Sequence, residues 1–148
     1  MLFGTPQTAA ELRGIEGKAE KRNYRSDRAR SGVLRSGALG FDMLAEETVL
    51  QLKEDYPHIR LVLVLPCPPE QQTLKWRADQ RQRYYEILER ADKVRILSPQ
   101  YTNDCMLARN RHLVDGSAYL ICYLREQRGG TAYTVRYARE QGLEIIQL

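Results

Sequence analysis

The sequence predicts a single α/β domain, built on a doubly wound, mainly parallel sheet with helices on both faces. From residue 37 onward, short apolar runs alternate with segments of helical periodicity, and the links between them are short. The length of 148 residues is that of one domain, which we place over residues 1–148. Because strand–helix–strand crossovers are right-handed, few other topologies fit this alternation.

The first predicted helix covers residues 41–55. Its apolar residues recur at steps of three and four, and it ends before Pro57. Residues 59–65 form a predicted buried strand, since the run is almost entirely leucine and β-branched residues and is stopped by Pro66. Residues 70–91 are expected to form a polar loop followed by a helix with one apolar face.

The later elements continue the alternation. We predict strands over residues 94–97, 118–124 and 143–148, and helices over residues 103–115 and 129–141. Gly142 is expected to end the last helix in a left-handed conformation. The part before residue 36 is less regular, because only Val33-Leu34 is available as a strand there and residues 14–35 are charged without an apolar face.

Composition narrows the class of protein. The longest apolar run, residues 61–65, is far too short to span a bilayer, so a cytoplasmic protein with no membrane partner is expected. Cys67, Cys105 and Cys122 are an odd number with neither disulfide-framework nor zinc spacing, which predicts reduced thiols and no metal site. The net charge of +4 is concentrated in residues 18–35, but this stretch lacks a groove-binding motif, which disfavours nucleic acid as a partner.

The strand-to-helix junctions of an open parallel sheet share one edge, where ligands bind. The first junction is Ser36–Asp42. Gly37 and Gly40, with Ala38 between them, would let backbone amides approach a ligand closely. Asp42 is placed either to cap the next helix or to bind a ribose hydroxyl. A tight turn with a structural aspartate explains the same residues without a ligand.

The second junction is Gly129-Gly130-Thr131, which opens a predicted helix, with Thr134 one turn on. Free amides and the positive end of a helix dipole favour a phosphate at such a place, by about 0.3–1 kcal/mol for the dipole alone. A glycine turn that binds nothing is the alternative interpretation.

The third junction joins a loop containing Tyr101 to the helix predicted after it. Met106, Arg109 and Asn110 lie on that helix. Arg109 and Asn110 are polar residues beside an apolar stripe, which favours a clamp facing a ligand over a solvated face.

Taken together, these motifs resemble those of a known family. The residues that carry the resemblance are Ser36–Asp42, the run 61–67, Trp76, the runs 97–102 and 105–111, Val114-Asp115 and the run 129–135. They resemble the YpsA-like (DUF1273) family of the SLOG superfamily. These are Rossmann-like domains related to the cytokinin-activating LOG phosphoribohydrolases and to the DNA-processing protein DprA. The resemblance covers about three-quarters of the chain.

The resemblance implies a Rossmann-like fold with a pocket for a nucleotide or nucleotide-derived ligand, and no additional cofactor. It places the glycines of the second junction at the phosphate, with the first junction beside them. In the LOG enzymes, an arginine on the helix after a methionine and a glutamate just after the glycine-rich turn serve N-glycosidic cleavage. Met106 and Arg109 match the first half of that pattern, but no acidic residue follows Gly130 before Glu140. Because glycosidic cleavage needs a carboxylate, the missing glutamate disfavours hydrolysis.

The amino-terminal part departs from the family pattern. Members resemble one another in a strand ending in a Phe-x-Gly-His-Arg type motif, and Phe3-Gly4-Thr5 is at most a remnant of it. Residues 14–35 are atypical for the family, which indicates either a locally rebuilt segment or a reading-frame disturbance.

Our first functional hypothesis is binding or sensing of a nucleotide-derived small molecule, such as one related to NAD or ADP-ribose. The alternative is a nucleotide hydrolase or phosphoribohydrolase, with Arg109 as the clamp and Asp42 or Asp115 as the acid or base. A DNA-associated protein, by analogy with DprA, is a second alternative. Catalysis by Cys105 with His112 is disfavoured against a buried structural thiol. A homodimer is a further expectation, and Trp76 belongs to the core, the pocket mouth or a dimer contact.

Overall fold

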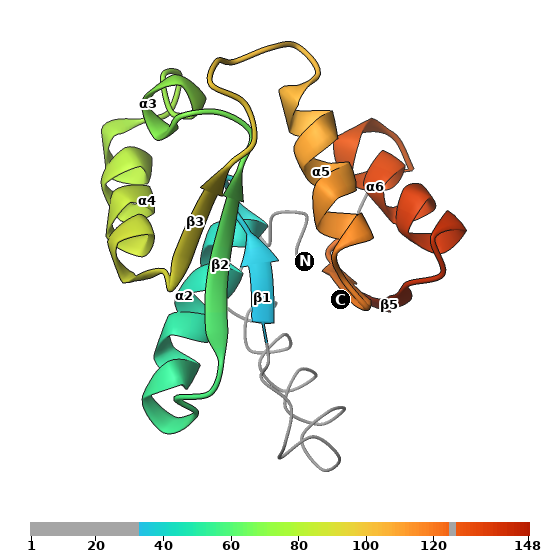
Figure 1. The fold of residues 1–148 in the computed structure, drawn as a ribbon, viewed down its shortest axis with the longest axis horizontal. Coiled ribbons are helices and arrows are strands. Elements are labelled where there is room, and N and C mark those ends of the chain that lie inside the picture. The colour runs from blue at the N-terminus through green and yellow to red at the C-terminus, as the bar shows by residue number, and fades with distance from the viewer. Residues whose placement is uncertain (1–32, 125–126) are drawn as a thin grey trace.

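The computed structural model describes residues 33–124 and 127–148, and there strands and helices alternate along the chain (Figure 1). The predictions made for Phe3-Gly4-Thr5 and for residues 14–32 lie outside the described residues. None of the helices in the described part has the length and apolar character that crossing a membrane requires.

The first half of the fold is a three-stranded parallel sheet. Its strands are β1 (Val33–Ser36), β2 (Arg60–Leu65) and β3 (Lys93–Ile96), in the order β1-β2-β3. Since all three strands run the same way, the links that follow them emerge at one edge of the sheet. Among the described residues β3 pairs only with β2, and all four of its residues are exposed.

Three helices accompany this sheet: α2 (Phe41–Asp55), α3 (Pro69–Gln72) and α4 (Ala78–Arg90). Alternate residues of β2, among them Leu61 and Leu63, join the apolar faces of α2 and α4 in one buried cluster. Met43 from α2 and Tyr84 from α4 are fully enclosed in it. This cluster therefore covers one face of the sheet.

The second half of the fold repeats the alternation with α5 (Cys105–Asp115), β4 (Tyr119–Cys122), α6 (Gly129–Glu140) and β5 (Glu144–Gln147). β4 and β5 form a two-stranded parallel sheet. Its buried cluster includes Leu120 and Leu113, and it also includes Val64 from β2. The remaining face of β2 therefore packs against the second half, on the side where Figure 1 shows α5.

The α/β class and the helices on both faces are confirmed, and the arrangement is consistent with a Rossmann-like fold. The single open sheet is confirmed only in part, because the described residues form two parallel sheets. Predicted element bounds agree closely, although β1 extends to Ser36 and the polar loop after residue 69 begins with the short helix α3. Gly142 has φ 75°, which confirms the left-handed end of α6.

Asp92 ties the amino-terminal ends of β2 and β3 to helix α2. Its carboxylate accepts hydrogen bonds from Lys53 Nζ at 2.6 Å and from the Leu61 backbone N–H at 2.8 Å, and it pairs with Arg60. The hydrogen bond from Lys53, with that from Leu61, holds the pKa of Asp92 well below its ordinary value. These contacts fix the sheet edge opposite the strand-to-helix junctions.

Candidate ligand-binding site

A pocket of about 770 Å³ opens among the links that follow β1, β2 and β3. It is lined by Ala38, Leu39, Glu70, Gln71, Gln72, Leu74, Lys75, Trp76, Tyr101 and Met106. Most of the lining is apolar. The pocket therefore lies at the carboxyl ends of parallel strands, where ligands bind in this class of fold.

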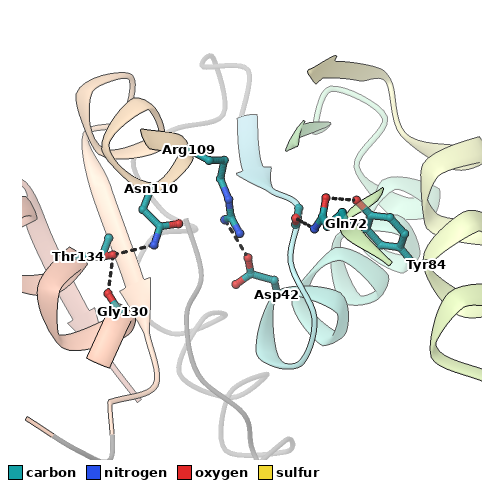
Figure 2. Close-up of polar contacts among 8 residues, drawn as sticks. Asp42, Gln72, Tyr84, Arg109, Asn110, Gly130 and Thr134 are labelled. Atoms are coloured by element: carbon teal, nitrogen blue, oxygen red, sulfur yellow. Dashed lines mark hydrogen bonds and ion pairs between the residues drawn. The ribbon is translucent and has the colours of Figure 1, made fainter. Parts of the chain in front are cut away.

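A chain of buried hydrogen bonds holds the wall formed by α3. Tyr84 Oη donates to Gln72 Oε1 at 3.1 Å, and Gln72 Nε2 donates to the Gly37 carbonyl oxygen at 2.9 Å (Figure 2). The Trp76 and Tyr84 rings pack in an edge-to-face arrangement, with 5.0 Å between ring centroids. Because each group is fixed by the next, the core positions both the first junction and the pocket wall.

Backbone conformation and packing explain the two glycines of the first junction without a ligand. Gly37 has φ 143°, and a Cβ atom there would lie 2.7 Å from the Val64 carbonyl oxygen. Gly40 has φ 91° and is the residue before α2. The prediction that Asp42 caps α2 is wrong, because no side chain forms a cap hydrogen bond at this helix end. Packing of the turn on β2 thus requires Gly37 whether or not a ligand is bound.

Asp42 is instead buried against Arg109. Arg109 Nη1 donates to Asp42 Oδ2 at 3.5 Å, with the two residues 1% and 2% exposed (Figure 2). Burial raises the pKa of Asp42 above its ordinary value, and the charge of Arg109 opposes the rise. Neither residue lines the pocket. Their predicted roles as ribose ligand and clamp stay predictions, and in this conformation both side chains are shielded from solvent.

Glu46 is a buried acid that sequence reasoning missed. It lies one turn after Asp42 on α2 and is completely enclosed. Burial, together with the nearby Asp42, raises the pKa of Glu46 to about 8. The spacing of four residues from Asp42 was the available signal, since such residues share a helix face.

The second junction forms the open amino end of α6. Gly129 and Gly130 are exposed, and a Cβ atom at either would meet nothing within 4 Å. Gly129 has φ 88°. No side chain caps this helix end, and neither glycine nor Thr131 lines the pocket. Phosphate binding there stays a prediction.

Asn110 and Thr134 connect α5 to α6. Asn110 Nδ2 donates to Thr134 Oγ1 at 3.1 Å, and Thr134 Oγ1 donates to the Gly130 carbonyl oxygen at 2.8 Å (Figure 2). Both side chains are buried. Both side chains therefore take part in the packing of α5 on α6, and their contact with a ligand stays a prediction.

The third junction supplies a second wall of the pocket. Tyr101 and Met106 line the pocket with exposed side chains. The Tyr101 backbone N–H donates to Gln71 Oε1 at 2.6 Å. Of the predicted ligand-binding residues, the pocket thus brings together Ala38, Tyr101 and Met106. The segment from Glu70 to Lys75 was missed as a site because it reads as a polar loop, whereas the pocket mouth was one of the alternatives predicted for Trp76, which lines the pocket.

The candidate acids lie in different places. Asp115 is exposed at the end of α5 and accepts a hydrogen bond from Tyr137 Oη at 2.9 Å. Glu70 is the acidic residue among the pocket-lining residues. Within residues 33–124 and 127–148, no group of three or more His, Cys, Asp and Glu side chains is placed to hold a metal ion.

Parallel strands, alternating helices and a pocket at the strands' carboxyl ends are the features of Rossmann-like α/β domains. A family model described as the YspA SLOG family, YpsA, matches residues 19–145. The chain therefore belongs to this family, and the resemblance found in the sequence is confirmed.

Curated relatives agree with this family. A UPF0398 protein of Halalkalibacterium halodurans is 32% identical over 109 residues, which are 72% of this chain and 57% of the relative. A UPF0398 protein of Brevibacillus brevis is 30% identical over 112 residues, or 74% of this chain and 58% of the relative. One from Bacillus cereus is 30% identical over 113 residues, covering 74% and 60%. The matched region is thus less than two thirds of the length of these relatives.

Proposed function

We propose that this chain binds a nucleotide-derived small molecule in the pocket at the carboxyl ends of β1, β2 and β3, and that it does not hydrolyse this ligand. The observation that carries the proposal is the pocket itself. Its volume of about 770 Å³ suits a small organic ligand, and it lies at the edge of the sheet where such domains hold nucleotides.

The lining favours a flat ring with a polar extension. Trp76 and Tyr101 present aromatic surface, and Met106 adds a polarizable thioether. Stacking of a base on aromatic side chains is worth about 1–3 kcal/mol in nucleic-acid complexes. Lys75 lies in the same lining and offers a cation to a phosphate. Ligands related to NAD or ADP-ribose combine these two features.

The carboxylates argue against turnover. Cleavage of a glycosidic bond needs an acid or base within hydrogen-bond reach of the reacting atoms. Asp42 is buried in its contact with Arg109, and Asp115 lies outside the pocket lining. Glu70 is the acid that the lining does contain, and it stands at none of the positions expected of the catalytic acid or base. The glutamate expected after the glycine turn is missing from the sequence. Binding or sensing therefore agrees better with the geometry than hydrolysis does.

Tryptophan fluorescence tests the proposal directly, because Trp76 is the only tryptophan and lines the pocket. We expect AMP, ADP, ADP-ribose, NAD or a cyclic nucleotide to change its emission with a saturable dose dependence. The same ligand at 100 times its Kd should stabilise the fold by about 2.7 kcal/mol, seen as a higher Tm. Chromatography of the incubated ligand should recover it intact.

A matched pair of variants on α5 tests whether the change in Trp76 emission reports binding in the pocket. Met106→Glu places a charge in the lining and should weaken binding about tenfold or more. Ala108→Glu adds the same charge to an exposed position outside the lining and should leave the affinity unchanged. No saturable response to any of these nucleotides would contradict the proposal, and release of a free base would favour the hydrolase instead.

A further inference from the structure

Two adjacent glutamines at the end of α3 line the pocket, and the fold uses their side-chain amides differently. Gln72 is buried, its Oε1 accepts from Tyr84 Oη at 3.1 Å, and its Nε2 donates to the Gly37 carbonyl oxygen at 2.9 Å. Gln71 is exposed, and its Oε1 accepts from the Tyr101 backbone N–H at 2.6 Å. Among the hydrogen bonds of the described residues, the Gln71 amide therefore takes part at one end only.

The partner of Gln71 determines which way its amide points. A backbone N–H can only donate, so the Gln71 atom that faces Tyr101 has to be the carbonyl oxygen. The nitrogen, with its two N–H bonds, then occupies the other arm of the planar amide. An amide turned the other way would set donors against each other and lose the hydrogen bond. Because Gln71 lines the pocket with an exposed side chain, its N–H bonds are available to a ligand.

The other polar side chains of the α3 wall have different chemistry. Glu70 is an acid, and Lys75 offers a cation that suits a phosphate. The Gln72 amide is already engaged at both ends within the core. Gln71 is therefore the neutral amide in this wall that can donate to an uncharged part of a ligand.

We propose that Gln71 determines the specificity of the pocket by donating an N–H to a ring nitrogen of a purine base. The assignment rests on the proposed function and narrows its ligand class to purine nucleotides. Trp76 and Tyr101 offer aromatic surface on which a flat base can stack. Stacking covers the faces of the base and leaves the acceptor nitrogens at its edge open to a donor. Adenine, the base of ligands related to NAD or ADP-ribose, carries such acceptors at N1, N3 and N7.

The hydrogen bond to Tyr101 prepares Gln71 for this contact. Its side chain is held at Oε1 before a ligand arrives, so less rotamer freedom is left to lose on binding. A base that lacks the acceptor would cover the amide N–H and leave it unpaired. We expect the contact to contribute about five- to tenfold to the affinity for a purine nucleotide.

Binding of AMP and of its 1-deaza, 3-deaza and 7-deaza analogues tests this contact on the full chain. Each analogue replaces one ring nitrogen by C–H, which removes one acceptor and keeps the ring shape and the phosphate. Emission of Trp76, which lines the pocket, follows each titration. We expect the wild type to bind one analogue about five- to tenfold more weakly than AMP, and the other two about as well as AMP.

Two substitutions of Gln71 connect this preference to its amide. Gln71→Leu removes the donor and should bind AMP and the weak analogue equally well. Gln71→Glu keeps an acceptor for the Tyr101 N–H but puts a carboxylate oxygen where the donor was, so the preference should vanish or reverse. If Gln71 only held the loop at Tyr101, both variants would keep the preference for AMP. Gln82→Leu, an exposed glutamine outside the lining, should behave as the wild type does.

The outcomes separate this assignment from the proposed function. Equal affinity of the wild type for AMP and every analogue, or a preference for AMP that survives in the Gln71 variants, would overturn the role of Gln71 alone. A wild type that responds to NAD or ADP-ribose but not to AMP would also overturn it and leave the proposed function standing. No response to any nucleotide would overturn both. The two Gln71 variants are independent, so one that folds is sufficient.

Discussion

At the scale of single residues, the glycines of the two junctions differ in whether the fold tolerates a Cβ atom at their positions. Gly37→Ala should destabilise the protein by about 2 kcal/mol or more, because φ 143° is strained for alanine and its Cβ atom would lie 2.7 Å from a carbonyl oxygen. Gly130→Ala should be neutral or slightly stabilising, since space is open there and alanine favours a helix. Urea denaturation measures both.

The two substitutions form a matched pair, since each adds one methyl group to a glycine-containing junction. Equal denaturation midpoints for the two variants would contradict the assignment of Gly37 to packing on β2. A Gly130 variant that folds normally is also the right background in which to test phosphate binding at α6.

Glu46 should make the stability of the protein depend on pH. Its pKa in the folded state is about 8, above the ordinary value of 4.5, so the native state holds a proton that the unfolded state releases. The stabilisation from this proton is complete below about pH 4.5 and is lost as the pH rises to about 8. Over this window the free energy of unfolding should fall by ~1.4 kcal/mol per pH unit at most.

Glu46→Gln tests this, because glutamine cannot release a proton. Its stability relative to the wild type should increase steadily between about pH 5 and 8, in denaturation curves measured at each pH. Glu54→Gln, an exposed position on the same helix, should show no such trend. Parallel pH profiles for wild type and Glu46→Gln would show that Glu46 is not the group responsible.

At the scale of elements, one hydroxyl forms a buried hydrogen bond between α5 and α6. Thr134→Val should destabilise the fold by about 1–3 kcal/mol, because the Asn110 amide would lose its hydrogen-bond acceptor while remaining buried. The variant should unfold at lower denaturant concentration with no ligand present.

Thr134→Ser separates the hydroxyl from the methyl group. Serine keeps the hydrogen bonds to Asn110 and Gly130 and loses one buried methyl, which costs about 0.8 kcal/mol. If the serine variant is as unstable as the valine variant, the methyl group rather than the hydrogen bonds holds the helices together.

The elements themselves were largely predictable from the sequence. The apolar steps of three and four in α2, and the unbroken apolar run of β2, are strong local signals that the structure confirms. Helix α3 was not predicted, because four residues are too few to show a period and its start depends on the Pro68-Pro69 pair.

At the scale of the whole molecule, sequence reasoning located the edge that carries the pocket but few of the residues that line it. Parallel strands place their following links together, and this rule correctly led to Ala38 and Tyr101. It did not show that Arg109 packs against Asp42, since that contact joins residues 67 positions apart. The separation of the strands into two sheets is likewise a long-range property that local patterns do not contain.

The exposed strand β3 bears on how copies of the protein behave together. Within residues 33–124 and 127–148, β3 has a strand partner on one side only, and Val94 at 41% and Ile96 at 47% are exposed on it. An unpaired strand edge with exposed apolar side chains is a template onto which another chain can add. Lys93 and Arg95 alternate with them, so a second β3 aligned in register would bring like charges together. Colloidal solubility at high concentration thus depends partly on two side chains outside the pocket lining, and salt that screens them would favour aggregation.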